Sequence, residues 1–211
     1  MQGLFGVVSA VMTGKIVEFD DGNKQYPTAY MKEMTDYQVW LSDTGLQGDF
    51  QADKKHHGGL DKALLLYGES SYAMWREDHD LDLGYGSFGE NLTVSVWDES
   101  NVCIGDIFQI GKALVEVSQP RQPCWKISSV LGDKSMLKRV LDTGRTGWYC
   151  RVLKEEYLQR GMMVTLKERP HPDWTVLRAN GVMKHKKEKP EEVDTLLALP
   201  QLADAWKKDL R

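Results

Sequence analysis

Short apolar runs separated by glycine-containing turns fill the chain as far as residue 168, and this pattern constrains the fold more than any other feature. Runs of this length, rich in β-branched and aromatic residues, are typical of β-strands. Many short strands with few helices predict a mainly β protein, a closed or nearly closed β-barrel with peripheral helices. We expect strands over 3–11, 15–19, 38–41, 63–67, 91–96, 107–110, 113–117, 147–153 and 162–166, and helices over 70–79 and 135–141.

The pattern changes after Arg169, where prolines interrupt the chain and the strand signals end. Three short helices are predicted there, over 175–183, 190–197 and 200–210. Pro190 and Pro200 suit the first turn of the last two, because a helix tolerates proline at its start. The sequence therefore predicts a β-barrel domain over residues 1–168 and a three-helix domain over residues 169–211.

Composition excludes several classes of protein. The 27 Lys and Arg residues are outnumbered by 31 Asp and Glu, a net charge of -4, which argues against a nucleic-acid-binding protein. No apolar run approaches the roughly 20 residues that span a membrane, and the N-terminus lacks the basic start of a secretory signal. Three cysteines are too few for a disulfide scaffold and suit a reducing compartment. We therefore expect a soluble, cytoplasmic protein with no nucleic-acid or membrane partner.

The charges are unevenly distributed along the chain. Residues 69–106 hold 1 basic and 9 acidic groups, whereas residues 107–154 hold 9 basic and 3 acidic groups. Such blocks are often the solvated faces of a mixed surface. The basic block also contains an unusual proline-rich loop, so a local anion-binding site is an equally good interpretation.

The segment DKKHHGG, residues 53–59, is the first candidate anion site. Paired glycines let backbone N–H groups converge on an anion, and flanking Lys and His side chains suit phosphate. A glycine turn with solvated lysines explains the same residues equally well. The two histidines also suggest a metal pair, although no third ligand stands at a convincing spacing. The residues concerned are Lys54, Lys55, His56, His57, Gly58 and Gly59.

Two further glycine-containing loops are candidates for ligand binding. Asn91 follows the loop 84–89, and its amide both donates and accepts hydrogen bonds. Arg145 stands between Gly144 and Gly147 after a predicted helix, an arrangement that suits an oxyanion. Each loop also has a simpler interpretation, a turn in the first case and a helix C-cap at Gly144 in the second.

The cysteine loop SQPRQPCWKI, residues 118–127, is the most unusual segment. Two prolines restrict the backbone around Arg121 and Cys124. Nearby cations favour the thiolate, so we expect the pKa of Cys124 to lie below that of a free cysteine. Cys103 and Cys150 instead stand in apolar strand-like runs, where cysteine is typically a small buried hydrophobe. A thiolate beside phosphate-binding groups indicates either a cysteine nucleophile or a ligand to a soft or high-valent metal of a phosphorylated cofactor.

Five motifs in order along the chain, HHGGLDKALLLY, FGENLTV, IGDIFQIG, QPRQPCWK and GRTGWYCRV, resemble the MOSC domain family. The family takes its name from the C-terminal domain of molybdenum cofactor sulfurase. The helical tail resembles the three-helix domain of the stand-alone bacterial members, the YiiM type.

The resemblance implies a MOSC-type β-barrel that binds molybdenum cofactor (molybdopterin), with Cys124 as the catalytic residue and the protein ligand to the metal. The residues implied to grip the pterin and its phosphate are Lys55, His57, Gly58, Gly59, Asn91, Arg121 and Arg145. The choice between Lys54 and Lys55, and between His56 and His57, is open.

The implied function is reduction of N-hydroxylated compounds such as 6-hydroxylaminopurine, a detoxification reaction in which an N–OH bond becomes N–H. No flavin, haem or iron–sulfur motif is present in the sequence, so electrons are expected from a separate reductase. Two alternatives remain: a carrier of molybdenum cofactor, and a sulfur-transfer protein that uses a Cys124 persulfide. The sequence does not decide between a monomer and a homodimer.

Overall fold

The computed structural model describes residues 5–53 and 58–211. Within these residues seven strands form a closed barrel in the order β13-β9-β10-β11-β7-β8-β1, and β1 pairs with β13 to complete the ring. This confirms the expected mainly β barrel. The barrel strands are β1 (Phe5–Thr13), β7 (Leu64–Gly68), β8 (Leu92–Val94), β9 (Ile107–Ile110), β10 (Ala113–Pro120), β11 (Trp148–Lys154) and β13 (Met163–Glu168).

All neighbouring barrel strands are antiparallel except β7 and β8, which run parallel with Leu66 opposite Leu92. Parallel neighbours need a crossover connection, and helix α2 (Glu69–His79) lies in the connection between them. At the seam, Phe5 of β1 pairs with Thr165 of β13. β9 and β10 form the hairpin expected at Gly111, with Ile110 opposite Ala113.

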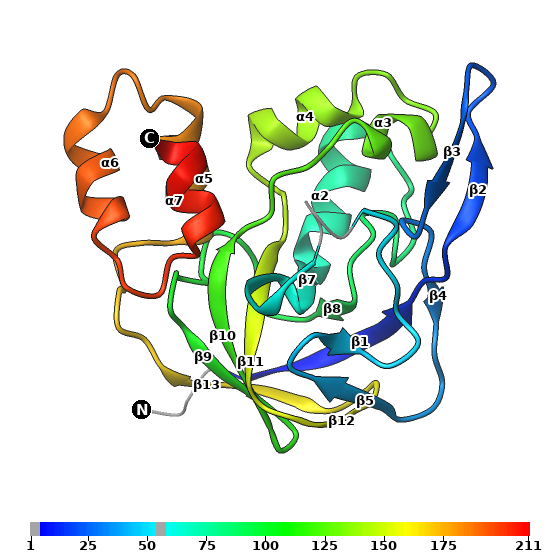
Figure 1. Ribbon diagram of the computed structural model, residues 1–211, viewed down its shortest axis with the longest axis horizontal. Coiled ribbons are helices and arrows are strands. Elements are labelled where there is room, and N and C mark those ends of the chain that lie inside the picture. The colour runs from blue at the N-terminus through cyan, green and yellow to red at the C-terminus, as the bar shows by residue number, and fades with distance from the viewer. Residues whose placement is uncertain (1–4, 54–57) are drawn as a thin grey trace.

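Smaller elements surround the barrel. β4 (Glu33–Met34) extends the sheet beside β1, and β5 (Val39–Ser42), β6 (Gly45–Leu46) and β12 (Glu156–Leu158) form a three-stranded sheet. The hairpin of β2 (Val17–Asp20) and β3 (Gln25–Thr28) lies on the opposite side of the molecule from the C-terminal helices (Figure 1). A 3₁₀ turn, η1 (Leu60–Lys62), precedes β7.

The three C-terminal helices, α5 (Val176–Lys184), α6 (Pro190–Leu197) and α7 (Asp204–Leu210), lie together beside the barrel (Figure 1). Their buried side chains, such as Val176 and Trp206, belong to the same hydrophobic cluster as Phe108 and Val115 of the barrel. The core is therefore continuous across residue 168, and the expected boundary at 168/169 stays a prediction. None of the helices in the described ranges is long and apolar enough to cross a bilayer.

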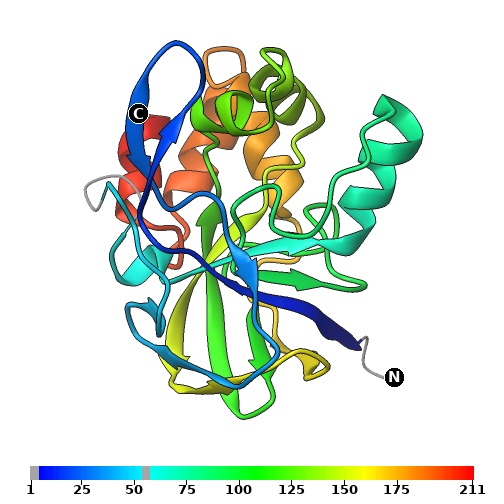
Figure 2. The ribbon, with the colours of Figure 1, turned by 90° about the vertical axis from the view of Figure 1, so that its right-hand side faces the viewer.

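A second, smaller cluster packs beneath α2, α3 (Lys126–Val130) and α4 (Met136–Thr143). Trp75 of α2, Ile127 of α3 and Val140 of α4 are all fully buried in it. In Figure 2, α2 stands on one side of the molecule and α7 on the other. Because Ile127 anchors the short helix that follows Cys124, this cluster fixes the far end of the cysteine loop.

The expected strands and helices are confirmed to within a few residues, with two kinds of difference. The last helix begins at Asp204 rather than at Pro200, because Leu202 and Leu199 close a turn and Ala203 is extended. α3, β3, β4, β6 and β12 were not anticipated. α3 follows a proline-rich stretch that favours extended backbone, and β3 contains Pro27, which weakens a strand signal.

Candidate functional site

Cys124 opens onto a cavity of about 90 Å³ at one end of the barrel. Its walls come from the cysteine loop, from the segment 28–32, from the segment 49–53, and from β7, β8 and β11 or residues adjoining them. The lining includes four cations, Lys32, Lys62, Arg121 and Lys126, together with Asp49, Asn91, Tyr30 and Tyr149. The structure therefore brings three predicted site residues together: Cys124, Arg121 and Asn91.

The fold positions the cysteine loop through its backbone. β10 ends at Pro120, and the Arg121 N–H donates to the Gly147 carbonyl at 3.0 Å. The Ile127 N–H donates to the Cys124 carbonyl at 3.2 Å, at the start of α3. Cys124 is partly exposed. The thiol therefore stands on a short loop that is fixed at both ends and opens toward the cavity.

Arg121 is buried, with 5% of its surface exposed, and its Nη1 finds no hydrogen-bond partner among the described residues. Its guanidinium lies 5.7 Å from the centre of the Tyr30 ring. Burial opposes the charged form, but interactions with Tyr30 and Tyr149 raise the pKa of Arg121, so the side chain is charged. A buried guanidinium N–H with no acceptor costs free energy, and an anion in the cavity would satisfy it.

Lys32 and Asp49 form a buried ion pair in the same cavity, with Nζ 2.6 Å from Oδ1. Burial lowers the pKa of Lys32, while the adjacent carboxylate acts in the opposite direction. Asp49 also accepts from the Gly14 N–H at 2.7 Å and from Asn91 Nδ2 at 2.9 Å. Sequence reasoning missed this pair, because neither residue belongs to a recognisable motif.

Asn91 connects this ion pair to the barrel. Its Oδ1 accepts from the Leu65 N–H at 3.1 Å, while its Nδ2 donates to Asp49. The amide is 5% exposed, and both of its ends are bonded within the protein. Asn91 therefore lines the Cys124 cavity, where it holds Asp49 in place.

Gly58 and Gly59 line a neighbouring cavity rather than the Cys124 cavity. Gly59 has a φ of 99°, and a side chain there would meet open space. Lys55 and His57, with the alternatives Lys54 and His56, lie outside the described residues. The predicted phosphate grip by this segment therefore stays a prediction.

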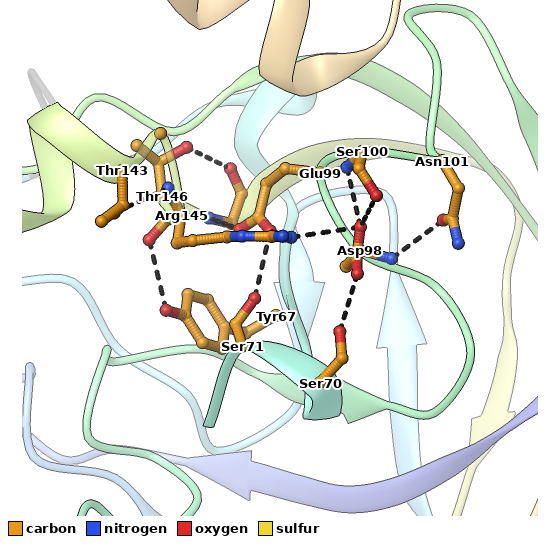
Figure 3. Close-up of polar contacts among 12 residues, drawn as sticks. Tyr67, Ser70, Ser71, Asp98, Glu99, Ser100, Asn101, Thr143, Arg145 and Thr146 are labelled. Atoms are coloured by element: carbon orange, nitrogen blue, oxygen red, sulfur yellow. Dashed lines mark hydrogen bonds and ion pairs between the residues drawn. The ribbon is translucent and has the colours of Figure 1, made fainter. Parts of the chain in front are cut away.

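Arg145 does not line the Cys124 cavity. Its Nη1 lies 3.2 Å from Asp98 Oδ1 and 3.3 Å from Glu99 Oε2, so two carboxylates take up its charge (Figure 3). Glu99 is fully buried and also accepts from Ser71 Oγ at 3.2 Å. The structure thus separates Arg145 from Cys124, Arg121 and Asn91.

The Arg145 loop nevertheless supports the cysteine loop. Glu99 Oε1 accepts from the Gly147 N–H at 2.7 Å, and the Gly147 carbonyl accepts from the Arg121 N–H. Gly147 has a φ of 76°, and a Cβ there would lie 2.6 Å from the Leu66 carbonyl oxygen. The second glycine of GRTG is therefore required by the close approach of β7.

The other two cysteines are buried, as predicted. Cys150 is fully buried in the barrel core, and Cys103 is 1% exposed. Burial raises the pKa of Cys103 to about 11 and raises that of Cys150 as well, so both are thiols at neutral pH. Cys124 is the partly exposed cysteine of the three.

The residues present fit the phosphate and metal end of a molybdenum cofactor. A partly exposed thiol, a buried guanidinium with an unsatisfied N–H and three lysines share one cavity, and thiolate sulfur is a soft ligand. No group of three His, Cys, Asp or Glu side chains in residues 5–53 and 58–211 is placed to hold a bare metal ion.

Comparisons with known proteins agree with the architecture. Residues 53–165 match the MOSC domain family, and residues 174–211 match the YiiM-like, 3-alpha helix domain. Over 204 residues the chain is 34% identical to Protein YiiM of Escherichia coli (strain K12), a match that covers 95% of this chain and 89% of YiiM. The crystal structure of YiiM from Geobacillus stearothermophilus superposes with a TM-score of 0.82 at 27% identity, and the match covers 97% of each chain.

A longer fungal relative is also similar. The chain is 39% identical over 183 residues to a protein of Gibberella moniliformis named "Reductase". That match covers 85% of this chain but 32% of the fungal protein. The chain therefore corresponds to about a third of that relative.

Proposed function

Because the chain belongs to the MOSC domain family and carries the YiiM-like three-helix domain, we propose that it is a molybdenum-cofactor-dependent reductase of N-hydroxylated compounds. The proposed substrates are 6-hydroxylaminopurine and related bases, and the proposed role is their detoxification in the cytoplasm. The observation that carries the proposal is the Cys124 cavity, where a partly exposed thiol and the unsatisfied Arg121 guanidinium lie together. The relative named "Reductase" supports an oxidoreductase.

Cys124 is proposed to ligate molybdenum, and Arg121 to bind the anionic part of the cofactor. Lys126 lines the same cavity, where its Nζ donates to the Pro27 carbonyl at 3.1 Å. The bound cofactor supplies two-electron reduction chemistry at its metal. The surrounding protein orients the group and keeps Arg121 charged beside it.

The reaction has a simple balance. An N–OH group takes up two electrons and two protons, the N–O bond breaks, and the amine and one water leave. Lys32 and Lys126 line the cavity, and we propose that their side-chain nitrogens deliver these protons. The electrons require a partner, and we propose a separate reductase, since this chain matches about a third of the longer relative.

The test combines metal content with turnover. The protein is expressed in a host that makes molybdenum cofactor, molybdenum is measured per chain, and reduction of 6-hydroxylaminopurine is followed with an artificial electron donor. Cys124→Ser is expected to lose molybdenum and more than about a hundredfold of the activity, since even outer-shell changes at metal sites cost 10–100-fold. Cys150→Ala, the matched control, is expected to keep both per folded molecule.

The same experiment separates the alternatives. Molybdenum in the wild-type protein without turnover would indicate a carrier of the cofactor. Cyanide-releasable sulfur on Cys124 without molybdenum would indicate sulfur transfer. Full activity of Cys124→Ser would contradict the proposed reductase site.

A further inference from the structure

A groove of about 730 Å³ lies between α4, α5 and the cysteine loop. Arg121 lines both this groove and the Cys124 cavity, so the two adjoin at its side chain. Gln122 and Pro123 also line the groove, and Pro123 is bonded directly to Cys124. No described residue of the range 49–62 lines it. The groove therefore reaches the cysteine loop from outside the Cys124 cavity.

The groove is positively charged, although the whole chain has a net charge of -4. Its described lining has one carboxylate, that of Asp142, and four cations: Arg121, Lys134, Lys138 and Lys184. The Asp142 carboxylate pairs with Lys138 of the same helix and with Lys184 of α5, whose Nζ lies 2.8 Å from Oδ1. Lys134 is exposed, and no carboxylate of the described residues pairs with its ammonium. This excess of positive charge attracts an acidic partner.

Apolar side chains share the groove with these charges. They are Leu137 and Leu141 of α4 and Met183 of α5. Leu141 is 48% exposed, although the next residue along the helix, Val140, is fully buried. Exposed apolar surface together with charged groups is typical of a site that binds another protein. A nucleic acid fits less well, because the Asp142 carboxylate would face its phosphates.

From this arrangement we infer that the groove is the docking site of an acidic electron-donating protein, the separate reductase of the proposed function. The inference rests on that function, since it requires a reaction that consumes electrons. Each turnover removes two electrons from the redox centre of the partner. One N–OH group takes up these electrons and two protons, its N–O bond breaks, and the amine and one water leave. The three-helix domain contributes to the interface through Met183 and Lys184 of α5.

The first test measures binding of oxidised flavodoxin, a small acidic electron-transfer protein, to the cofactor-loaded protein by calorimetry at low ionic strength. The wild type is expected to bind it saturably, and added salt is expected to weaken binding by screening the charges. Lys134→Glu is expected to weaken binding about tenfold or more, since a charged cleft raises association rates by about 10–10³-fold. Lys167→Glu on β13 is the matched control, because Lys167 is exposed, undergoes the same change of charge and lines neither the groove nor the Cys124 cavity.

A second variant tests the apolar part of the groove. Leu141→Gln is expected to weaken flavodoxin binding at every salt concentration, because salt does not screen an apolar contact. The loss in Lys134→Glu is expected to shrink as salt is added. An unchanged Kd in Leu141→Gln would indicate a diffuse electrostatic encounter and would overturn docking in the groove.

Three further results would overturn the inference: no saturable binding of flavodoxin by the wild type, equal Kd values for wild type and Lys134→Glu, or equal losses in Lys134→Glu and Lys167→Glu. Tighter binding of a DNA duplex than of flavodoxin would also overturn it, and would assign the groove to a nucleic acid.

A second measurement separates this inference from the proposed function. Reduction of 6-hydroxylaminopurine is followed with reduced flavodoxin and, separately, with reduced methyl viologen, a small cationic donor that needs no docking site. Lys134→Glu is expected to lose about tenfold in kcat/KM for flavodoxin and nothing with methyl viologen. An equal loss with both donors overturns the docking site while the reductase stands. Absence of turnover with both donors, while Lys134→Glu still weakens flavodoxin binding, overturns the reductase and leaves a groove that docks an acidic protein.

Discussion

Arg121 and Arg145 have similar surroundings in the sequence, because each stands in a loop between residues with special backbone conformations. These residues are prolines beside Arg121 and glycines beside Arg145. In the fold they have opposite surroundings. Arg145 forms ion pairs with Asp98 and Glu99, whereas Nη1 of Arg121 is buried without a partner in the described residues. Arg145 therefore stabilises the fold, whereas Arg121 is available to bind a ligand. A guanidinium therefore indicates an anion site only after the carboxylates around it are known.

Arg145→Ala should produce the largest loss of stability. It leaves Glu99 fully buried and Asp98 mostly buried without their cation, which costs about 2–3 kcal/mol in the free energy of unfolding. Uptake of a proton by Glu99 limits the loss. Urea denaturation measures it, and molybdenum content per folded molecule is expected to stay at the wild-type level. If Arg145→Ala unfolds like the wild type but loses molybdenum, then Arg145 binds the cofactor and does not stabilise the fold, which contradicts the comparison.

Arg121→Ala is expected to show the converse behaviour. Each charge-assisted hydrogen bond to the cofactor is worth about 1.5–3 kcal/mol, so molybdenum retention should fall by about tenfold or more. The free energy of unfolding should change by less than about 1 kcal/mol, since the substitution removes a cation–π interaction with the Tyr30 ring. Dialysis followed by metal analysis checks the first expectation and urea denaturation the second. Full retention of molybdenum would move the anion site elsewhere.

Glu99→Gln tests the Arg145 loop through the pH dependence of the free energy of unfolding. Burial raises the pKa of Glu99 above its ordinary 4.5, so the folded protein binds this proton more tightly than the unfolded chain. The stability from this group is present below pH 4.5 and is lost as pH rises through the folded pKa. Relative to Glu99→Gln, the wild type should therefore lose stability as the pH rises above 4.5. The loss is about 1.4 kcal/mol for each tenfold by which the folded protein binds this proton more tightly than the unfolded chain. Parallel urea series at several pH values test the sign, and a gain with pH would contradict it.

Asn180→Ala should give the smallest effect. Asn180 of α5 donates to the Gly144 carbonyl at 3.1 Å and to Thr146 Oγ1 at 2.9 Å, so it ties the three-helix domain to the Arg145 loop. Loss of these bonds should cost about 1 kcal/mol in unfolding. Asn23→Ala, in the exposed β2–β3 turn, is the control and should cost less. Equal effects would mean that α5 does not support this loop.

The barrel was predictable because each strand is marked by a short sequence pattern of its own. Apolar runs such as 63–67 and 107–110 identify themselves by composition and length, and Gly111 marks the turn between two strands. The start of α7 was not predictable from Pro200, because a proline that suits the first turn of a helix suits a preceding turn equally well.

The candidate site was half predictable. Cys124 and Arg121 are neighbours in one loop, so a single motif reveals both. Lys32 and Asp49 reach the same cavity from separate loops, and their pairing depends on the path of the chain around the barrel. Arg145 shows the reverse case. The glycines beside Arg145 correctly indicate a loop with an unusual backbone. Glu99, which neutralises the guanidinium, is remote in sequence and belongs to no recognisable motif.

The seam between β1 and β13 has a consequence for synthesis. Phe5 pairs with Thr165, so β1 cannot complete its hydrogen bonds until β13, the last strand of the barrel, has been translated. Until then one edge of β1 is an open template for other strands, the situation that promotes aggregation. The nascent chain therefore depends on rapid release and closure or on chaperone cover, and the three C-terminal helices emerge only as the barrel becomes able to seal.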